Sequence, residues 1–165
     1  MSLSGKFQVS ANFDESLAQD LGQRLFQCRK SSLIALLDGS GAGQANKIYA
    51  DSVSVAQSIN TDLDLSGALA GAFGTVVFTA IKGILIAAGS ANPGNLTVGN
   101  VTNGITSPFG AATHSQIIAP GGVYANINPS AAGFAITAGT ADLLRIASAA
   151  TAGTYTFDVV VVGIG

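Results

Sequence analysis

Alternating apolar and polar residues run through much of the chain after residue 46. The segments 47–56 and 58–65 alternate with period two, which indicates strands with one face on a core and one face outward. In the first segment Tyr49, Asp51 and Val53 share a side, and this mixture predicts a bulge or a change of face near Asp51. Further strands are predicted at 75–79, 82–88, 95–99, 116–119, 123–127, 134–137, 142–147 and 154–162.

Turn residues separate these short segments at intervals of roughly ten residues, a spacing typical of an all-β sandwich or barrel. Pro, Gly or Asn supplies the turn chemistry at 91–94, 102–104, 120–122, 128–130 and 138–140. The last predicted strand becomes apolar on both faces at 159–162. We therefore expect it to be a central strand, or one that lies under a neighbouring subunit.

The first 37 residues are predicted to form an N-terminal arm, and residues 38–165 a β-sandwich body. Within the arm, Leu17, Leu21, Leu25 and Cys28 recur at helical spacing. Gly22 lies in the middle of this segment and costs a helix about 1 kcal/mol relative to Ala. Two interpretations of 15–30 therefore stay open, a helix and an extended strand-turn-strand.

The long apolar stretch 68–91 raises the question of a membrane span. Lys82 and four glycines interrupt it, and its β-branched segments have the length of strands, so we expect two buried strands instead. The N-terminus lacks the basic and apolar regions of a secretory signal, and the single cysteine, Cys28, cannot form a disulfide within the chain. Folding in a cytoplasm is the expectation.

Charge is scarce and unevenly placed. The chain carries 16 Asp, Glu, Lys and Arg among 165 residues, and only four of them follow Asp64: Lys82, Asp142, Arg145 and Asp158. Ordinary domains are about 25% charged. We therefore expect partners to cover much of this surface. The net charge of −2 and the lack of a basic run argue against nucleic acid or an anionic membrane as the partner.

Candidate catalytic and ligand-binding residues are few. His114 is the only histidine, and its sequence context is not that of a nucleophile elbow. The glycine-rich segment 38–44 lacks the Gly-Lys-Ser/Thr ending of a phosphate-binding loop and is interpreted as a connector between arm and body. Asp62 and Asp64 share a strand face and could hold a calcium ion or lie in solvent. We assign no catalytic, cofactor or metal residue.

Eight segments of strand and turn residues form a set that points to a family. They are 38–48 (DGSGAGQANKI), 63–67 (LDLSG), 72–74 (AFG), 95–100 (NLTVGN), 107–110 (SPFG), 119–122 (APGG), 138–146 (AGTADLLRI) and 158–163 (DVVVVG). Together they resemble the capsid cement, or head-decoration, proteins of tailed bacteriophages, which have a jelly-roll-like β-sandwich. The similarity extends over residues 33–165 and concerns structural residues rather than a catalytic motif.

The resemblance implies a virion protein without enzymatic activity, made in the host cytoplasm. Such a protein forms a homo-oligomer, expected to be a trimer, and binds the major capsid protein between capsomers on the outside of the head. We place capsid contact on the charged arm, with Lys6, Arg24, Arg29 and Lys30 as candidates. Candidate aromatic anchors for subunit contacts are Phe109, Tyr124 and Phe134. For each of these residues a solvated arm or a core aromatic is an equally open interpretation.

Three other functions compete with this one. A receptor- or carbohydrate-binding β-sandwich of a phage fibre or tail is the main alternative, although sugar binding favours exposed aromatics and the chain has no Trp and only three Tyr. An enzyme is disfavoured by the single histidine, the single cysteine and the sparse carboxylates. A tail-tube or major capsid protein is disfavoured because a shell lattice protein usually needs a longer chain.

Overall fold

The computed structural model describes residues 2–20 and 22–165, and these residues form strands, turns and loops without a helix. The predicted all-β antiparallel sandwich is confirmed. None of the described segments is a helix of the length and hydropathy needed to cross a membrane. The stretch 68–91 instead contains β6 (Leu69–Gly71), β7 (Gly74–Val76) and β8 (Ala80–Ala88).

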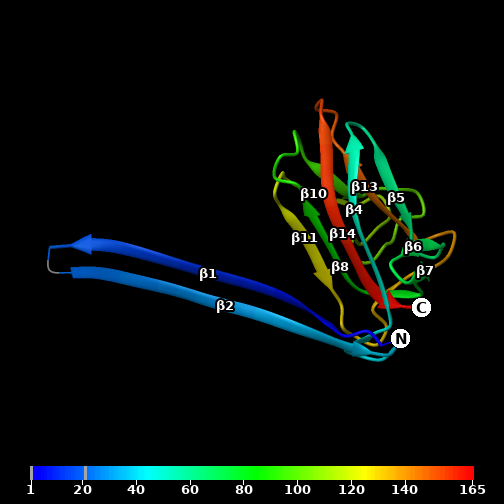
Figure 1. Ribbon diagram of the computed structural model, residues 1–165, viewed down its shortest axis with the longest axis horizontal. Helices are drawn as coiled ribbons and strands as arrows, with labels where there is room; N and C mark the ends of the chain where they lie inside the picture. The colour runs from blue at the N-terminus through cyan, green and yellow to red at the C-terminus, as the bar shows by residue number, and fades with distance from the viewer. Residues whose placement is uncertain (1, 21) are drawn as a thin grey trace.

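Two sheets of the described residues build the sandwich (Figure 1). The first, here named the β4 sheet, has the strand order β11-β8-β14-β4. Its strands are β4 (Lys47–Ala56), β8, β11 (Val123–Ile127) and β14 (Thr154–Ile164), and the short β12 (Phe134–Ala135) also pairs with β8. The second, the β5 sheet, has the order β10-β9-β13-β5. Its strands are β5 (Asn60–Asp64), β9 (Leu96–Gly99), β10 (Ser115–Ile118) and β13 (Leu143–Ser148).

These eight strands pair in a nested way. The first pairs with the last (β4 with β14), the second with the seventh (β5 with β13), the third with the sixth (β8 with β11) and the fourth with the fifth (β9 with β10). All four pairs are antiparallel. The chain is therefore arranged like one long hairpin rolled into two layers.

The core lies between the two sheets. On β14, Tyr155, Phe157, Val159 and Val161 are buried and alternate with more exposed residues, as a strand with one face on a core requires. Buried Leu144 and Ile146 of β13 belong to the same core cluster from the opposite layer. Burial of each such large apolar side chain contributes about 1.5–3 kcal/mol, so this cluster holds the two sheets together.

The N-terminal arm is a long β-hairpin. Strands β1 (Gly5–Gln19) and β2 (Gly22–Asp38) pair residue by residue, from Gly5 opposite Leu36 to Gln19 opposite Gly22. Figure 1 shows this hairpin projecting far from the sandwich. Of the two interpretations left open for 15–30, the extended one is correct. Gly22 has a φ of 151°, which other residues rarely adopt and which suits the end of a hairpin better than the middle of a helix.

The bulge expected near Asp51 is not present. Strand β4 pairs with β14 without a break, and the irregularity lies instead where β14 meets β8, between Val162 and Gly163. Asp51 is exposed because β4 is an edge strand, and its carboxylate accepts a hydrogen bond from the Tyr49 hydroxyl at 3.2 Å. The edge of the sheet therefore tolerates a polar residue between apolar ones.

Candidate interaction surfaces

The side chains that could support chemistry are engaged in structural contacts. His114 places Nδ1 3.0 Å from the Phe109 carbonyl oxygen. Asp64 accepts hydrogen bonds from the backbone N–H groups of Ser66 and Gly67, as in an Asx turn. Within 2–20 and 22–165, no three His, Cys, Asp or Glu side chains lie close enough together to hold a metal ion.

The glycine-rich segment after β2 is a closed turn. The Gln44 side chain folds back over it and accepts a hydrogen bond from the Gly41 N–H at 2.7 Å. A Cβ at Gly39 would lie 2.6 Å from the same Gln44 oxygen, so the amide packs directly against the glycine backbone of the turn. This turn links the hairpin to β3 (Gln44–Ala45), which pairs in parallel with the end of β2.

The hairpin presents one apolar face, here called the arm face. Cross-strand partners point to the same side of a two-stranded ribbon, and Phe13 stands opposite Cys28 while Phe26 stands opposite Glu15. Phe13 is 67% exposed and Phe26 is 64% exposed. Val9, Ala11 and Leu17 continue this face, with Glu15, Arg24, Lys30 and Ser32 among its polar members. Among the described residues, Val9, Phe13, Leu17 and Phe26 of this row are each more than half exposed.

The opposite face of the hairpin is more polar, with Leu25 and Leu33 among its exposed large apolar residues. Asp14 and Arg29 form an ion pair across it at 2.7 Å, and Arg29 also donates a hydrogen bond to the Phe13 carbonyl oxygen at 3.1 Å. The four predicted capsid-contact residues all lie on the hairpin, but they divide between its faces. Lys6 and Arg29 point to the polar side, whereas Arg24 and Lys30 lie on the arm face. They therefore do not form one basic patch.

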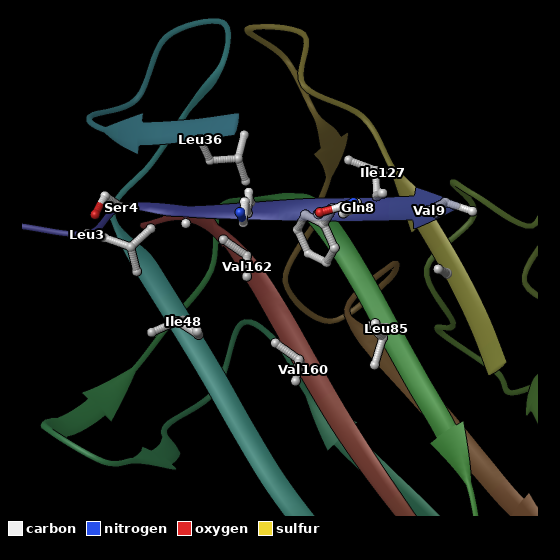
Figure 2. A pocket seen from close by; sticks show the side chains of 14 residues that line it. Leu3, Ser4, Gln8, Val9, Leu36, Ile48, Leu85, Ile127, Val160 and Val162 are labelled. Atoms are coloured by element: carbon white, nitrogen blue, oxygen red, sulfur yellow. The ribbon is translucent and has the colours of Figure 1, made fainter. Parts of the chain in front are cut away.

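The root of the hairpin packs on the β4 sheet. Leu36 and Val162 are buried there, with Phe7 and Ile34 packed against them. Figure 2 shows β1 crossing above β4, β14 and β8 at this point. Beside β1 lies a groove of about 390 Å³, whose lining includes Val9, Ile48, Leu85, Ala125 and Val160. The face of the hairpin that is buried at the root is the same face that is exposed further out.

The outer surface of the β4 sheet is apolar beyond the root. Its pairing places Ala50, Leu85, Ala125 and Val160 in one row across the four strands. The next row contains Ser52, Ala87, Val123 and Asp158, and Val123 is 61% exposed. We call these two rows the outer face. It is unusual for an antiparallel sheet to carry so many apolar residues on the side away from the core.

The outer surface of the β5 sheet contains an ion pair. Arg145 donates two hydrogen bonds to the Asp62 carboxylate, each 2.7 Å long. These bonds hold the pKa of Asp62 below its ordinary value of 3.8 and raise the pKa of Arg145. The same side carries exposed Asn60, half-buried Thr97 and Ala147, and one large apolar residue, Ile117, which is 69% exposed. The two outer surfaces therefore differ mainly in charge, since this one contains an ion pair and the outer face contains Asp158 alone.

The predicted aromatic anchors lie against the core rather than on a free surface. Phe109 and Tyr124 stack on each other, with ring centroids 5.9 Å apart and planes inclined by 18°. Both rings and Phe134 are half-buried and pack on the main cluster. Burial raises the pKa of Tyr124. The predicted anchors do not include Phe13 and Phe26, the exposed aromatics of the hairpin, although period-two alternation over 7–13 places Phe13 on an apolar face.

Two surfaces thus stand out, the arm face and the outer face of the β4 sheet. Both are apolar, both are exposed, and neither carries a dense charge. They have the properties of surfaces that become buried on assembly. Comparison of the chain with protein-family models, curated proteins and solved structures found no match.

Proposed function

We propose that the chain is a structural protein of a tailed-bacteriophage virion, a capsid decoration or cement protein without enzymatic activity. In this proposal it assembles with itself as a homotrimer and binds the major capsid protein between capsomers on the outside of the head. The observation that carries the proposal is the long hairpin, whose apolar face is exposed outside a sandwich with few charges.

The hairpin by itself supports a role in assembly. It contains 15 cross-strand pairs, and most of its length projects away from the sandwich. An isolated two-stranded hairpin is marginally stable in water. A ribbon of this length with exposed phenylalanines gains stability once another surface covers it, which is the behaviour expected of an arm that binds a neighbouring subunit or shell.

The strand order supports a jelly roll as the finer description of the fold. Eight strands in two four-stranded sheets, paired first with last and inward to fourth with fifth, correspond to a hairpin rolled into two Greek keys. Jelly rolls occur in viral capsid proteins and in lectins. The fold therefore agrees with the proposed virion role but does not by itself distinguish it from sugar binding.

The distribution of charge supports attachment through the hairpin. Four of the seven basic residues and three of the nine acidic residues lie between residues 6 and 30. Charged groups on an arm can set its register on a partner surface. Because a shell offers many identical sites, weak contacts at each site are sufficient when an oligomer binds several of them at once.

A receptor- or carbohydrate-binding module is the second candidate, because lectins share the jelly-roll architecture. Sugar sites usually need aromatic rings beside polar groups, but Tyr49 and Tyr155 are buried. Phe73 is 81% exposed, yet it lies alone in the turn between β6 and β7. A glycan array tests this alternative directly, and specific binding there would favour it over the cement function.

The decisive test is the presence of the chain in purified virions of the phage that encodes it, measured by quantitative mass spectrometry. We expect copy numbers comparable to the number of capsomers, and loss of heads under osmotic shock when the chain is deleted. Light scattering of the purified protein gives the mass of its oligomer. Absence from virions would overturn the proposal, whatever the oligomeric state.

A further inference from the structure

The hairpin root shows how the arm face and the β4 sheet fit together. Phe7 sits over Gly83 and beside Val162, and β1 crosses the strands of the sheet there. Only this first part of the hairpin contacts the sheet. The first row of the outer face overlaps the root contact at Val160, which packs against the root cluster, and the exposed part of the arm face begins at Val9.

We propose that the hairpin of a second copy of this chain lies beside β1 on the outer face, with its arm face against Val160, Leu85 and Ala125. This inference deepens the self-assembly in the proposed function by naming the two surfaces that meet. Each copy then donates one hairpin and receives one.

The dimensions of the two surfaces agree with this arrangement. A two-stranded ribbon is about 10 Å wide, and two rows of a sheet on one face span a similar width. Four strands are about 19 Å across, which six residues of an extended strand can cover. The exposed part of the arm face, from Val9 to Leu17 on β1 with Glu15 as its one charged residue on that strand, is longer than that. The ribbon therefore fits over the outer face while crossing all four strands.

Strand β1 also offers a free edge to the incoming hairpin. In the three-stranded order β1-β2-β3, β1 pairs with β2 on one side only, within the described residues. Residues Leu3 to Val9 border the groove over the β4 sheet (Figure 2). Unpaired N–H and C=O groups on an edge strand can pair with an added strand. Backbone pairing would then fix the register of the second hairpin.

The charges favour binding of the arm face to the outer face of the β4 sheet rather than to the outer surface of the β5 sheet. The arm face carries Arg24, Lys30 and Glu15, a net charge of +1, whereas the outer face carries Asp158 as its one charged residue. The outer surface of the β5 sheet instead contains the Asp62–Arg145 ion pair, whose burial under apolar side chains would be costly. A neighbouring arm is therefore expected on the β4 sheet only.

One contact of this kind is too small to hold two copies together firmly. A ribbon about 10 Å wide over a sheet about 19 Å across covers roughly 200 Å², which is smaller than one side of a standard protein interface, about 800 Å². One such contact would be weak. Two contacts per copy in a closed ring reinforce each other, and a head-to-tail contact that closes gives a ring.

Disulfide trapping tests the contact. Cys28 is the only cysteine and lies on the arm face, so the unaltered chain serves as the arm probe. In the test reaction it is mixed with C28S/A125C, whose new thiol lies on the outer face. In the control reaction it is mixed with C28S/A147C, whose thiol lies on the outer side of the β5 sheet. The two partners carry tags of different mass, and the mixture is oxidised briefly. C28S/A50C repeats the test from strand β4.

We expect disulfides between the two different chains with A125C or A50C and at least tenfold fewer with A147C. Equal trapping in the control, or none with either outer-face cysteine, would overturn the proposed contact. Trapping of Cys28 to another protein in intact virions, instead of to a second copy, would also overturn it. A chain that is present in virions but does not trap refutes this inference alone, whereas trapping by a chain absent from virions refutes the cement function alone.

Discussion

The Phe7 ring occupies the space that a side chain at Gly83 would need, since a Cβ built there would lie 2.5 Å from Cε2 of the ring. We therefore expect Gly83→Ala to displace Phe7 and to loosen the root of the hairpin. Overpacking of this kind costs about 1–3 kcal/mol of unfolding free energy. Urea denaturation of the variant measures this loss.

A double-mutant cycle attributes the effect to that contact. When Phe7 is replaced by leucine, the methyl group added by Gly83→Ala has more room. Residues in contact usually couple by about 0.5–3 kcal/mol. Gly83→Ala should therefore cost at least about 0.5 kcal/mol less in the Phe7→Leu protein than in the unaltered protein. Gly5→Ala is the matched control, because a Cβ at Gly5 meets nothing within 4 Å. Additive effects of the changes at 7 and 83 would show that the two residues do not limit each other.

The sequence predicts where strands lie but not which strands pair. Alternation identified the strand 154–162 and indicated a central strand, and β14 does lie between β8 and β4. The same pattern cannot say which strands pair, because alternation reports the buried side of a strand and not its neighbour. The nested pairing of β4 with β14, about 100 residues apart, is therefore visible only in three dimensions.

The conformation of the arm also could not be predicted from the sequence. Leu17 and Leu25 fit helical spacing, yet in the hairpin they lie on opposite faces of the ribbon. Local spacing could not decide between the two conformations, because both leave the leucines exposed and neither is fixed by a core. The sequence does not predict the interaction surfaces for a related reason. The predicted aromatic anchors lie in the body, whereas the exposed rings Phe13 and Phe26 lie on the arm.

Lys82 is expected to make stability depend on alkaline pH. Lys82 is 0% exposed, and Nζ donates hydrogen bonds to the carbonyl oxygens of Ser130 and Ala131. Within 2–20 and 22–165 no carboxylate forms an ion pair with it. Burial lowers the pKa of Lys82 from 10.5. Between the lowered pKa and 10.5 the unfolded chain binds the proton and the folded chain does not, so this group adds stability as pH rises.

The variant Lys82→Met isolates this effect. Tyr49 and Tyr124 have raised pKa values, so above pH 10 they act in the opposite direction in both proteins and cancel in the difference. We expect the unfolding free energy of the unaltered protein to rise relative to that of K82M as pH increases from 7 to 10.5, measured by urea denaturation. A difference that stays constant over this range would contradict the prediction.

The Asp62–Arg145 pair is expected to contribute stability that disappears in acid. The pKa of Asp62 is lowered from 3.8, chiefly by the hydrogen bonds from Arg145, so its contribution is complete above pH 3.8 and is lost as pH falls through the lowered pKa. Because both side chains are partly exposed, Asp62→Asn should cost only about 0.5–1 kcal/mol at pH 7. Denaturation at pH 7 and near pH 2 measures the difference.

Arg145→Lys provides the matched variant for this pair. It keeps the positive charge but cannot make the two parallel bonds from Nε and Nη2 to the carboxylate. We expect it to lose most of the contribution that Asp62→Asn loses. Full retention of stability in R145K would mean that charge alone, rather than the paired geometry, stabilises the outer side of the β5 sheet.

Asn92 is expected to be the most sensitive polar residue of the body. Its side chain is buried, with 7% exposed, and its amide forms two bonds with the backbone of Thr156: Nδ2 donates to the carbonyl oxygen at 2.9 Å and Oδ1 accepts from the N–H at 2.8 Å. Strand β8 ends at Ala88, so Asn92 supplies β14 with the partner that a longer neighbouring strand would provide. Asn92→Ala should cost about 1–3 kcal/mol, because the Thr156 N–H loses its acceptor, whereas the Thr156 carbonyl oxygen keeps a hydrogen bond from the Gly89 N–H. Asn95→Ala, at an exposed position three residues further on, should cost less than about 0.5 kcal/mol.

Hydrogen exchange at the Thr156 amide measures the effect of Asn92→Ala locally. Unchanged protection of this amide in N92A would show that water or another group replaces the side chain.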